Sequence, residues 1–463
     1  MKEILKITFA ATLILIAIPA ASAASNGTLF VGTPVELNAT DLTAICRDIS
    51  RDGNAAWIEL EKDNDIQYSH ILKQGDPIVY ESDSGLLTYQ IDATFHGTQT
   101  NMAKISQIDP AGIDMGALRT RPDSILLGIG ERRNLSDGTE IVHRMMGVNG
   151  DKALIELVGD GMGQYSHILK EGDPIVYKND SDEWVTYRID AIFRGIEHDL
   201  IELSPVDPSV IDFDYVQELA DNFILDVGAE KDIGSGITLR CTGIDLLDGT
   251  AWIELSRDGE VLYSHILREG EYFTYEDAGI LHACAVHRVF TGERKLVNTP
   301  VILKDGEMVN TGYTVAEEKL VEFSPVKISD IDITSIPDRS DYIMVGLGVP
   351  VELSGGAKLL LKQIDLGGEA VWIEIITDDG RFEKVINETS PFTYVAGDKN
   401  YVYALEAAFA GKEKSVIEIS FVGSSPVAET PVSDRTPTQA IPAFTASAAI
   451  AGVLIVIYGR KRR

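Results

Sequence analysis

A tryptophan, a glutamate and a histidine recur together along this chain at a nearly fixed spacing. In the best-preserved copy, Trp252 and Glu254 come before the turn residues Asp258 and Gly259, and His265 follows the turn. The glutamate is present in four copies and the histidine in three: Glu59, Glu156, Glu254 and Glu374; His70, His167 and His265. A carboxylate, an imidazole and an indole together could bind a metal ion, transfer protons or contact a sugar or protein partner.

The pattern does not predict catalysis. Acid–base work on a glycoside needs a second carboxylate at a fixed distance from the first, and none recurs beside these glutamates. The three histidines belong to different repeats, which disfavours a shared metal site. The chain contains no nucleophile elbow, His-Glu-x-x-His, phosphate-loop or EF-hand pattern. We therefore expect no enzyme and no resident cofactor, although turns such as Asp378-Asp379 could bind calcium or another divalent cation.

The spacing predicts that the recurring residues lie on a β-hairpin. Asp258-Gly259 is a two-residue hairpin turn, so Trp252 should pair with His265 and Glu254 with Tyr263. Turns at 63–64 and 160–161 predict the same pairing in the first two copies, with Leu154 at the tryptophan position of the second. Side chains alternate between the faces of a strand, and this directs one set to the core (Ile253, Leu255, Leu262 and Ile266) and the other outward (Trp252, Glu254, Tyr263 and His265).

The fourth copy indicates that this outward face is exposed. Its turn at 379–380 sets Trp372 opposite Asn387, which lies in a glycosylation sequence, and a glycan cannot be buried. The face could be a cross-strand pair that stabilises the sheet, or a contact patch for sugars or proteins. The candidate contact residues are Trp57, His70, Trp252, His265 and Trp372.

The hairpin marks a domain that is copied four times, in steps of about 95 to 120 residues. Each copy holds about six or seven short apolar stretches with turn residues between them and no amphipathic helix. This predicts an all-β chain of four tandem β-sandwich-like repeats, at residues 24–115, 116–215, 216–333 and 334–423. The third repeat has an insertion at about 293–319, which we expect to be a surface hairpin.

The two ends predict export and anchoring. Residues 1–23 have the charged start, apolar run and Ala-Ser-Ala cleavage pattern of a signal peptide, with a retained membrane anchor as the alternative. Residues 424–440 form a Ser/Thr/Pro stalk, and 441–459 are apolar over about 28 Å of helix, enough to span a bilayer. The basic tail 460–463 should be cytoplasmic. We expect a single-pass cell-surface protein with its ectodomain outside.

The formal net charge of −32 argues against a nucleic-acid partner, which would need a basic surface. Five asparagines are candidates for N-glycosylation: Asn26, Asn38, Asn134, Asn179 and Asn387. The three cysteines, Cys46, Cys241 and Cys284, are too few for a disulfide scaffold. Buried free thiols are one interpretation and a Cys241–Cys284 bridge is the other.

The third repeat resembles the duplicated domain of methanogen-type archaeal S-layer proteins. The resemblance rests on an Ile-Asp pair at 244–245, the Trp252-x-x-Leu255 strand, the Arg-Asp-Gly tip at 257–259 and the strand at 270–275. It implies tandem β-sandwiches in a cell-surface lattice, with other surface-layer proteins or further copies of itself as partners. An adhesin or ligand-binding receptor, with exposed aromatic faces that bind glycans or proteins, is the alternative.

Overall fold

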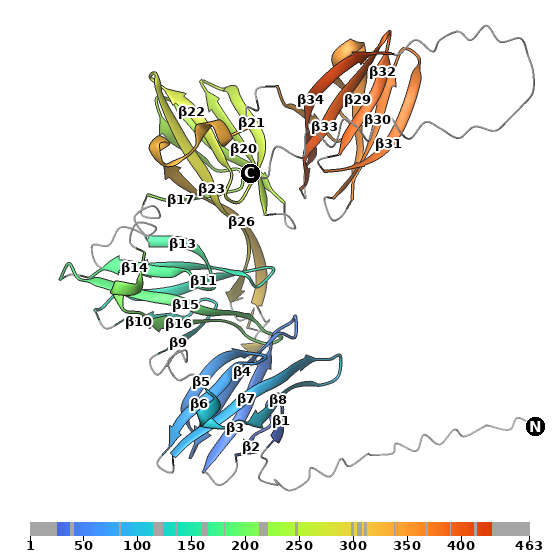
Figure 1. Ribbon diagram of the computed structural model, residues 1–463. Coiled ribbons are helices and arrows are strands. Elements are labelled where there is room, and N and C mark those ends of the chain that lie inside the picture. The colour runs from blue at the N-terminus through green and yellow to red at the C-terminus, as the bar shows by residue number, and fades with distance from the viewer. Residues whose placement is uncertain are drawn as a thin grey trace, which may run out of the picture.

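The computed structural model describes four consecutive β-rich units, drawn from blue to red along the chain in Figure 1. It describes residues 26–427 except for 38–40, 83–84, 114–123, 136, 160–164, 180, 213–220, 246–248, 298–300, 303–307, 310–312, 338, 340, 366–368, 389 and 412–413. The predicted signal peptide, anchor, basic tail and nearly all of the stalk lie outside these residues. Within them, no helix has the length and hydropathy needed to cross a membrane.

The prediction of an all-β, sandwich-like architecture is confirmed. Each unit contributes two antiparallel layers of four strands, one or two more strands than the sequence pattern predicted. One layer of the second unit and one of the third are continuous as an eight-stranded sheet, and the third unit adds a two-stranded sheet. The described helices are single 3₁₀ turns: η1 (Pro110–Gly112), η2 (Pro208–Val210), η3 (Ile328–Asp330), η4 (Ile333–Ser335) and η5 (Ser354–Gly356). We number the units domains 1 to 4. The fully buried residues of each core lie inside one of the four predicted ranges.

Domains 1 and 2 have the same strand order. Domain 1 pairs sheet β1-β8-β7-β6 with sheet β2-β3-β4-β5, and domain 2 pairs β9-β16-β15-β14 with β10-β11-β12-β13. The strands of domain 1 are β1 (Asn26–Phe30), β2 (Val35–Glu36), β3 (Leu42–Ile49), β4 (Ala55–Lys62), β5 (Asp65–Lys73), β6 (Pro77–Ser82), β7 (Gly85–His96) and β8 (Asn101–Gln107). Those of domain 2 are β9 (Ile125–Gly128), β10 (Arg132–Asn134), β11 (Glu140–Gly147), β12 (Lys152–Val158), β13 (Tyr165–Lys170), β14 (Pro174–Lys178), β15 (Trp184–Arg194) and β16 (Asp199–Pro205).

Domains 3 and 4 repeat this order. Domain 3 pairs β17-β26-β23-β22 with β18-β19-β20-β21, and domain 4 pairs β27-β34-β33-β32 with β28-β29-β30-β31. The strands of domain 3 are β17 (Phe223–Asp226), β18 (Glu230–Gly234), β19 (Ile237–Ile244), β20 (Thr250–Arg257), β21 (Glu260–Arg268), β22 (Tyr272–Asp277), β23 (Ile280–Val297), β24 (Val301–Ile302), β25 (Met308–Val309) and β26 (Tyr313–Val326). Those of domain 4 are β27 (Ile343–Gly346), β28 (Val351–Glu352), β29 (Lys358–Ile364), β30 (Ala370–Thr377), β31 (Gly380–Asn387), β32 (Pro391–Ala396), β33 (Lys399–Ala410) and β34 (Ser415–Pro426).

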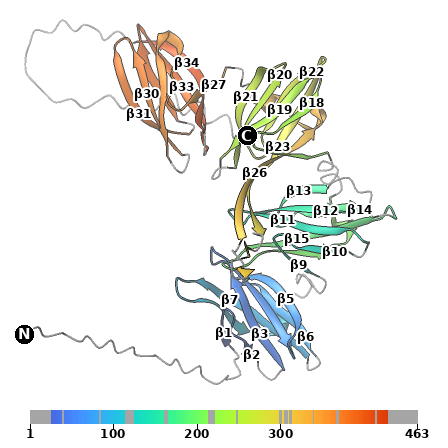
Figure 2. The ribbon, with the colours of Figure 1, turned by 180° about the vertical axis from the view of Figure 1, so that it is seen from behind.

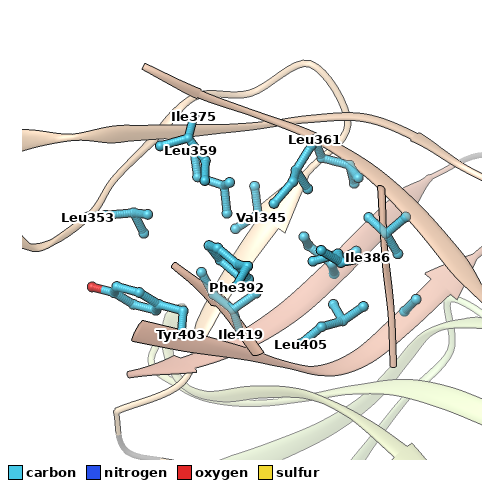
Figure 3. Packing of buried hydrophobic residues seen from close by; sticks show 14 of the residues in the cluster. Val345, Leu353, Leu359, Leu361, Ile375, Ile386, Phe392, Tyr403, Leu405 and Ile419 are labelled. Carbon is cyan, nitrogen blue, oxygen red and sulfur yellow. The ribbon is translucent and has the colours of Figure 1, made fainter. Parts of the chain in front are cut away.

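The core of each domain lies between its two sheets. In domain 4, Leu361 and Ile375 of one sheet face Phe392, Tyr403 and Ile419 of the other, and all five are buried (Figure 3). Burial alternates along the contributing strands because successive side chains point to opposite faces. The inward set therefore belongs to the domain's own core, and the outward set is available to a neighbour.

The extra residues of domain 3 lengthen two of its strands. β23 and β26 continue their pairing as far as Val297 and Tyr313, and β24 pairs with β25 beyond them. The lengthened pair runs down onto domain 2, as both views show (Figures 1 and 2). There, Gly292 of β23 pairs with Gly147 of β11, which joins one sheet of domain 3 to one sheet of domain 2.

The predicted hairpin register is wrong by one residue over most of its length. Next to the turn, Ser256 pairs with Val261 as expected, but a β-bulge follows, and beyond it Trp252 pairs with Ile266. Leu262, predicted to be core, is more than half exposed. The same bulge occurs in domain 1, where Trp57 pairs with Ile71. A bulge adds one residue to one strand only, so turn chemistry cannot reveal it.

The shift also corrects the faces. His70, His167 and His265 share a face with the inward residues Ile58, Ile155 and Ile253, instead of lying opposite the tryptophan position. They lie on β5, β13 and β21, each the edge strand of its sheet, where the inward face is also open to a neighbouring domain. In domain 4 the turn is Asp378-Asp379, so Trp372 pairs with Val385 and not with Asn387.

The three cysteines are free and buried, as in the first of the two interpretations. Burial raises the pKa of each thiol, of Cys46, Cys241 and Cys284 alike, to about 12. The thiolate is the reactive form, so at neutral pH these groups are almost wholly in the unreactive state.

We expect all three thiols to resist a small thiol reagent in the folded protein and to react fully in denaturant without reductant. The number of thiols titrated before and after unfolding measures this. A single reactive thiol in denaturant would reveal a Cys241–Cys284 bridge and contradict the structure.

Candidate functional site: the joints between domains

Four of the five predicted contact residues lie where two domains meet. Trp57 and His70 face domain 2, and Trp252 and His265 face domain 4. Trp372 alone lies on a face that no other described residue covers, and it is 38% exposed. The recurring hairpin is therefore a joint, built three times, at which one domain receives the next.

A buried glutamate of the next domain lies at the centre of each joint. In the first joint the His70 Nδ1 and Glu202 Oε1 atoms are 2.5 Å apart, and the backbone N–H of Ile71 donates to Glu202 Oε2 at 2.9 Å. In the second joint His167 and Glu322 are 2.7 Å apart, and Ile168 N–H donates to Glu322 at 2.9 Å. Glu202 and Glu322 are almost completely buried, so each carboxylate needs these partners.

The third joint keeps the pair and adds an arginine. His265 Nδ1 contacts Glu418 Oε1, and Arg339, from the segment between domains 3 and 4, donates to Glu418 Oε2 at 3.1 Å. Arg339 also donates to the carbonyl of Ile266 and to the carboxylate of Glu271. In this joint the arginine takes the place of the backbone N–H as the second partner of the carboxylate.

The residues of the Tyr-Ser-His-Ile-Leu strand are divided between the joint and the core of their own domain. Tyr263 packs edge-on against His265 with ring centroids 4.3 Å apart, and the same contact occurs in domains 1 and 2. The Ser264 hydroxyl accepts from the indole of Trp252 and donates to Glu254. Leu267 fills the core of its own domain. One strand thus serves its own core and the next domain together.

Apolar side chains surround each central pair. Ile71 and Trp57 pack with Phe193 and Leu200 of domain 2 in the first joint. The other two joints contain the equivalent clusters: Leu154, Ile168, Phe290 and Leu320 in the second; Trp252, Ile266, Phe409 and Val416 in the third. Removing water from the joint strengthens the electrostatic attraction at its centre.

A second ion pair also recurs across the joints. The residue after the Ile-Leu pair of the hairpin is basic in domains 1 to 3. It binds a glutamate of the next domain, which lies one position further along the repeat than the basic residue itself. The pairs are Lys73 with Glu171, Lys170 with Glu269 and Arg268 with Glu388. In the second joint Lys152 also binds Glu269, and burial of this carboxylate is outweighed by the two lysines, so its pKa lies below its usual value.

The backbones approach closely at a recurring glycine. Gly195 forms an isolated bridge with Ser50 of domain 1, and Gly292 pairs with Gly147 of domain 2. A β-carbon on Gly195 would overlap the carboxylate of Asp48 and the carbonyl of His198. Asp48 is itself buried and accepts from the N–H groups of Glu197 and His198 across the joint.

The recurring glutamates of the hairpin bind bases and hydroxyls within their own domain. Arg47 donates to Glu59 and Arg144 to Glu156, each at 2.5 Å, and Lys362 donates to Glu374 at 3.1 Å. The bases lie at the β-bulges between His143 and Met145 and at the equivalent places in domains 1 and 4. A bulge redirects a side chain, and here it directs a base toward the carboxylate.

The described residues contain no cluster of three or more His, Cys, Asp or Glu side chains that could hold a metal ion. A cavity of about 550 Å³ opens at the hairpin end of domain 3, lined by Tyr263, Tyr275, Arg257 and Glu276 among others. Of the described residues that line it, Glu276 alone carries a carboxylate, whereas a glycosidase uses a pair of acids.

Three of the predicted glycosylation sites can be placed on the described surface. Asn134 and Asn387 are exposed strand residues. Asn179 is half-buried, and its side-chain carbonyl accepts from the N–H groups of Ser181 and Glu183, so this asparagine shapes a turn. The side chain of Asn26 and all of Asn38 lie outside the described residues.

The central glutamates were not predicted as functional residues. Their signal was present in the sequence, since Glu202, Glu322 and Glu418 each stand between two apolar residues of a strand. A charge on such a strand needs a partner. That partner lies more than 130 residues earlier in the chain, beyond the reach of local patterns.

Neither a protein-family model nor a curated protein matches the chain. One solved structure, described as a new family of polysaccharide lyase, an ulvan lyase, aligns at 10% sequence identity. The alignment covers 86% of this chain and 82% of that one, with a TM-score of 0.10. A score this low carries no argument about fold or function.

We expect His167→Leu to open the second joint, because it leaves Glu322 buried without its main partner. Breaking a buried pair from one side costs about 3–5 kcal/mol. Hydrogen exchange of the Ile168 amide, which donates to Glu322, should speed up by orders of magnitude. Lys384→Leu is the matched control, because Lys384 holds the histidine position in domain 4 and no further domain among the described residues lies against it. Equal exchange in the wild-type and His167→Leu proteins would contradict the assignment.

We also expect the second joint to weaken in acid. Burial acts to raise the pKa of Glu322, but the hydrogen bond and charge of His167 and the hydrogen bond of Asn222 outweigh it, so this pKa lies below its ordinary value of 4.5. A carboxyl of this kind stabilises fully above its unfolded pKa and loses that effect as the pH falls through the folded pKa. Ile168 protection, corrected for intrinsic exchange, should therefore fall below about pH 4.5. Glu322→Gln should lack this step.

Proposed function

We propose that this protein is a structural component of the cell surface, an S-layer or S-layer-associated protein. In this proposal the chain is exported by residues 1–23 and held by a membrane helix at 441–459. Domains 1 to 4 stand outside the cell on the Ser/Thr/Pro stalk. Its partners are neighbouring surface-layer proteins or further copies of itself, and its surface asparagines carry glycans.

The observation that carries the proposal is the repeated joint. Three interfaces of one design hold each domain against the next through a buried carboxylate, an apolar cluster and a second ion pair. Tandem units with such interfaces behave as one extended arm, since each unit is stabilised by its neighbours. An arm of fixed geometry suits a protein that spaces or tiles a surface.

The use of the recurring residues agrees with a structural role. The glutamates and histidines that could do chemistry are taken up by ion pairs within and between domains. The charge of −32 would keep such an arm solvated by self-repulsion and gather cations around it.

An adhesin is the second candidate, and one observation favours it. Trp372 and Val385 of domain 4 pair across the hairpin β30–β31, and both are exposed on one face. An exposed aromatic and aliphatic group of this kind is typical of a surface that binds a partner. The other tryptophans named as contacts, Trp57 and Trp252, are committed to joints and are not open to a ligand.

We expect the purified ectodomain to form ordered two-dimensional sheets when it is concentrated, with divalent cations screening its acidic surface. Electron microscopy across a series of salt and calcium concentrations measures this. An ectodomain that stays monomeric under all these conditions would contradict a lattice-forming role. Loss of cell or glycan binding in Trp372→Ala, with unchanged thermal stability, would instead support the adhesin.

A further inference from the structure

The two ends of the tandem array carry half-joints that no other described residue covers. Among the described residues, no further domain lies on the receiving hairpin β30–β31 of domain 4, and none lies on the inserting edge of β7 and β8 of domain 1. Because the three internal joints have the same design, domain 4 of one copy would by default bind domain 1 of another copy. Such head-to-tail contacts do not close and so produce filaments.

The apolar parts of both half-joints are retained. Trp372 and Val385 hold the places of Trp57 and Ile71, and Val385 is 65% exposed. On domain 1, Phe95 holds the place of Phe193 and is 51% exposed. The shape that drives docking in the three internal joints is therefore present at both ends.

The central polar pair is replaced on both sides. The residue that follows the bulge in β15, β23 and β33 pairs with Glu202, Glu322 and Glu418, and its equivalent in β7 pairs with Lys104. The residue that pairs with Ile58 and Ile253 is histidine, and the one that pairs with Ile373 is Lys384. A joint between copies would place Lys104 against Lys384.

The second ion pair is lost as well. Domain 1 has Gln74 at the position that is a glutamate in the other domains (Glu171, Glu269 and Glu388). Domain 4 has Asn387 at the position that is basic in the other domains (Lys73, Lys170 and Arg268). Asn387 is exposed and is a candidate glycosylation site, so a glycan would stand in the joint itself.

We infer that Lys104, Gln74, Lys384 and Asn387 are specificity residues that prevent the tandem joint from forming between copies. All four replace polar residues of the joint and leave its apolar residues in place, so the two ends keep an apolar surface but do not bind each other. Like charges placed across an interface suppress the wrong partner far more than they cost the free protein. The consequence is an arm of fixed length, whose contacts with further copies use the sides of the domains.

This inference does not rest on the proposed function. Sheets formed through lateral faces would leave it standing, and so would a surface protein that forms no lattice. Only end-to-end association between unaltered copies conflicts with it.

The test restores the internal joint at both ends of the full-length chain, purified in a mild detergent. The variant carries Lys104→Glu, Gln74→Glu, Lys384→His and Asn387→Lys, and a photo-crosslinking amino acid replaces Val385. We expect the unaltered chain to show no cross-link from residue 385 to another copy. The restored variant should form head-to-tail chains, with about tenfold stronger association for each polar pair regained, and with cross-links that map to β7 and β8.

Lys358→Glu is the matched control, because it changes the charge of an exposed lysine on β29, outside the receiving hairpin β30–β31 and outside β7 and β8, and it should stay unassociated. Lys104→Glu alone, a surface change, provides a second variant that should associate more weakly than the full set. A restored variant that stays monomeric, cross-links that map elsewhere, or end-to-end chains of the unaltered protein would each overturn the inference.

Discussion

The arrangement of the domains depends on one constraint: a carboxylate that is buried between two domains needs a hydrogen-bonded partner. Glu202, Glu322 and Glu418 leave water completely when two domains meet, and moving an ion out of water costs several kcal/mol unless it is fully partnered. A domain that docked with the wrong rotation would bury the charge and lose its partners. The histidine and the adjacent donor therefore select one orientation, whereas the surrounding apolar contacts supply most of the attraction.

The hairpin provides this partner because one of its strands contributes side chains both to the core of its own domain and to the joint with the next domain. Alternation sends Leu267 to the core of domain 3 and Ile266 to the joint, while Tyr263 fixes the ring of His265 from the side. The β-bulge beside the turn sets this phase, since without it the tryptophan would pair with the histidine. A single inserted residue therefore decides which side chains hold a domain together and which hold two domains together.

The sequence was sufficient to predict the repeat, the all-β class and the hairpin turns, because these depend on local patterns of apolar alternation and turn residues. It was not sufficient for the register, since the bulge at Leu255 and Ser256 has no distinctive residue type. The role of His265 was missed for a different reason. Its partner, Glu418, belongs to another domain, and only the folded arrangement brings the two together.

In the repeats, apolar residues of the joint supply the attraction between domains, and polar residues determine which domains bind. Apolar residues persist at Phe95, Trp372 and Val385, which the described part of the chain leaves exposed. The polar positions do not persist, as Lys104 and Lys384 replace an acid and a histidine at the two ends. Apolar burial is non-directional and tolerates many partners, so it cannot tell a neighbour in the same chain from a copy of that chain. A buried polar pair can make this distinction, because one like charge converts its gain into a penalty.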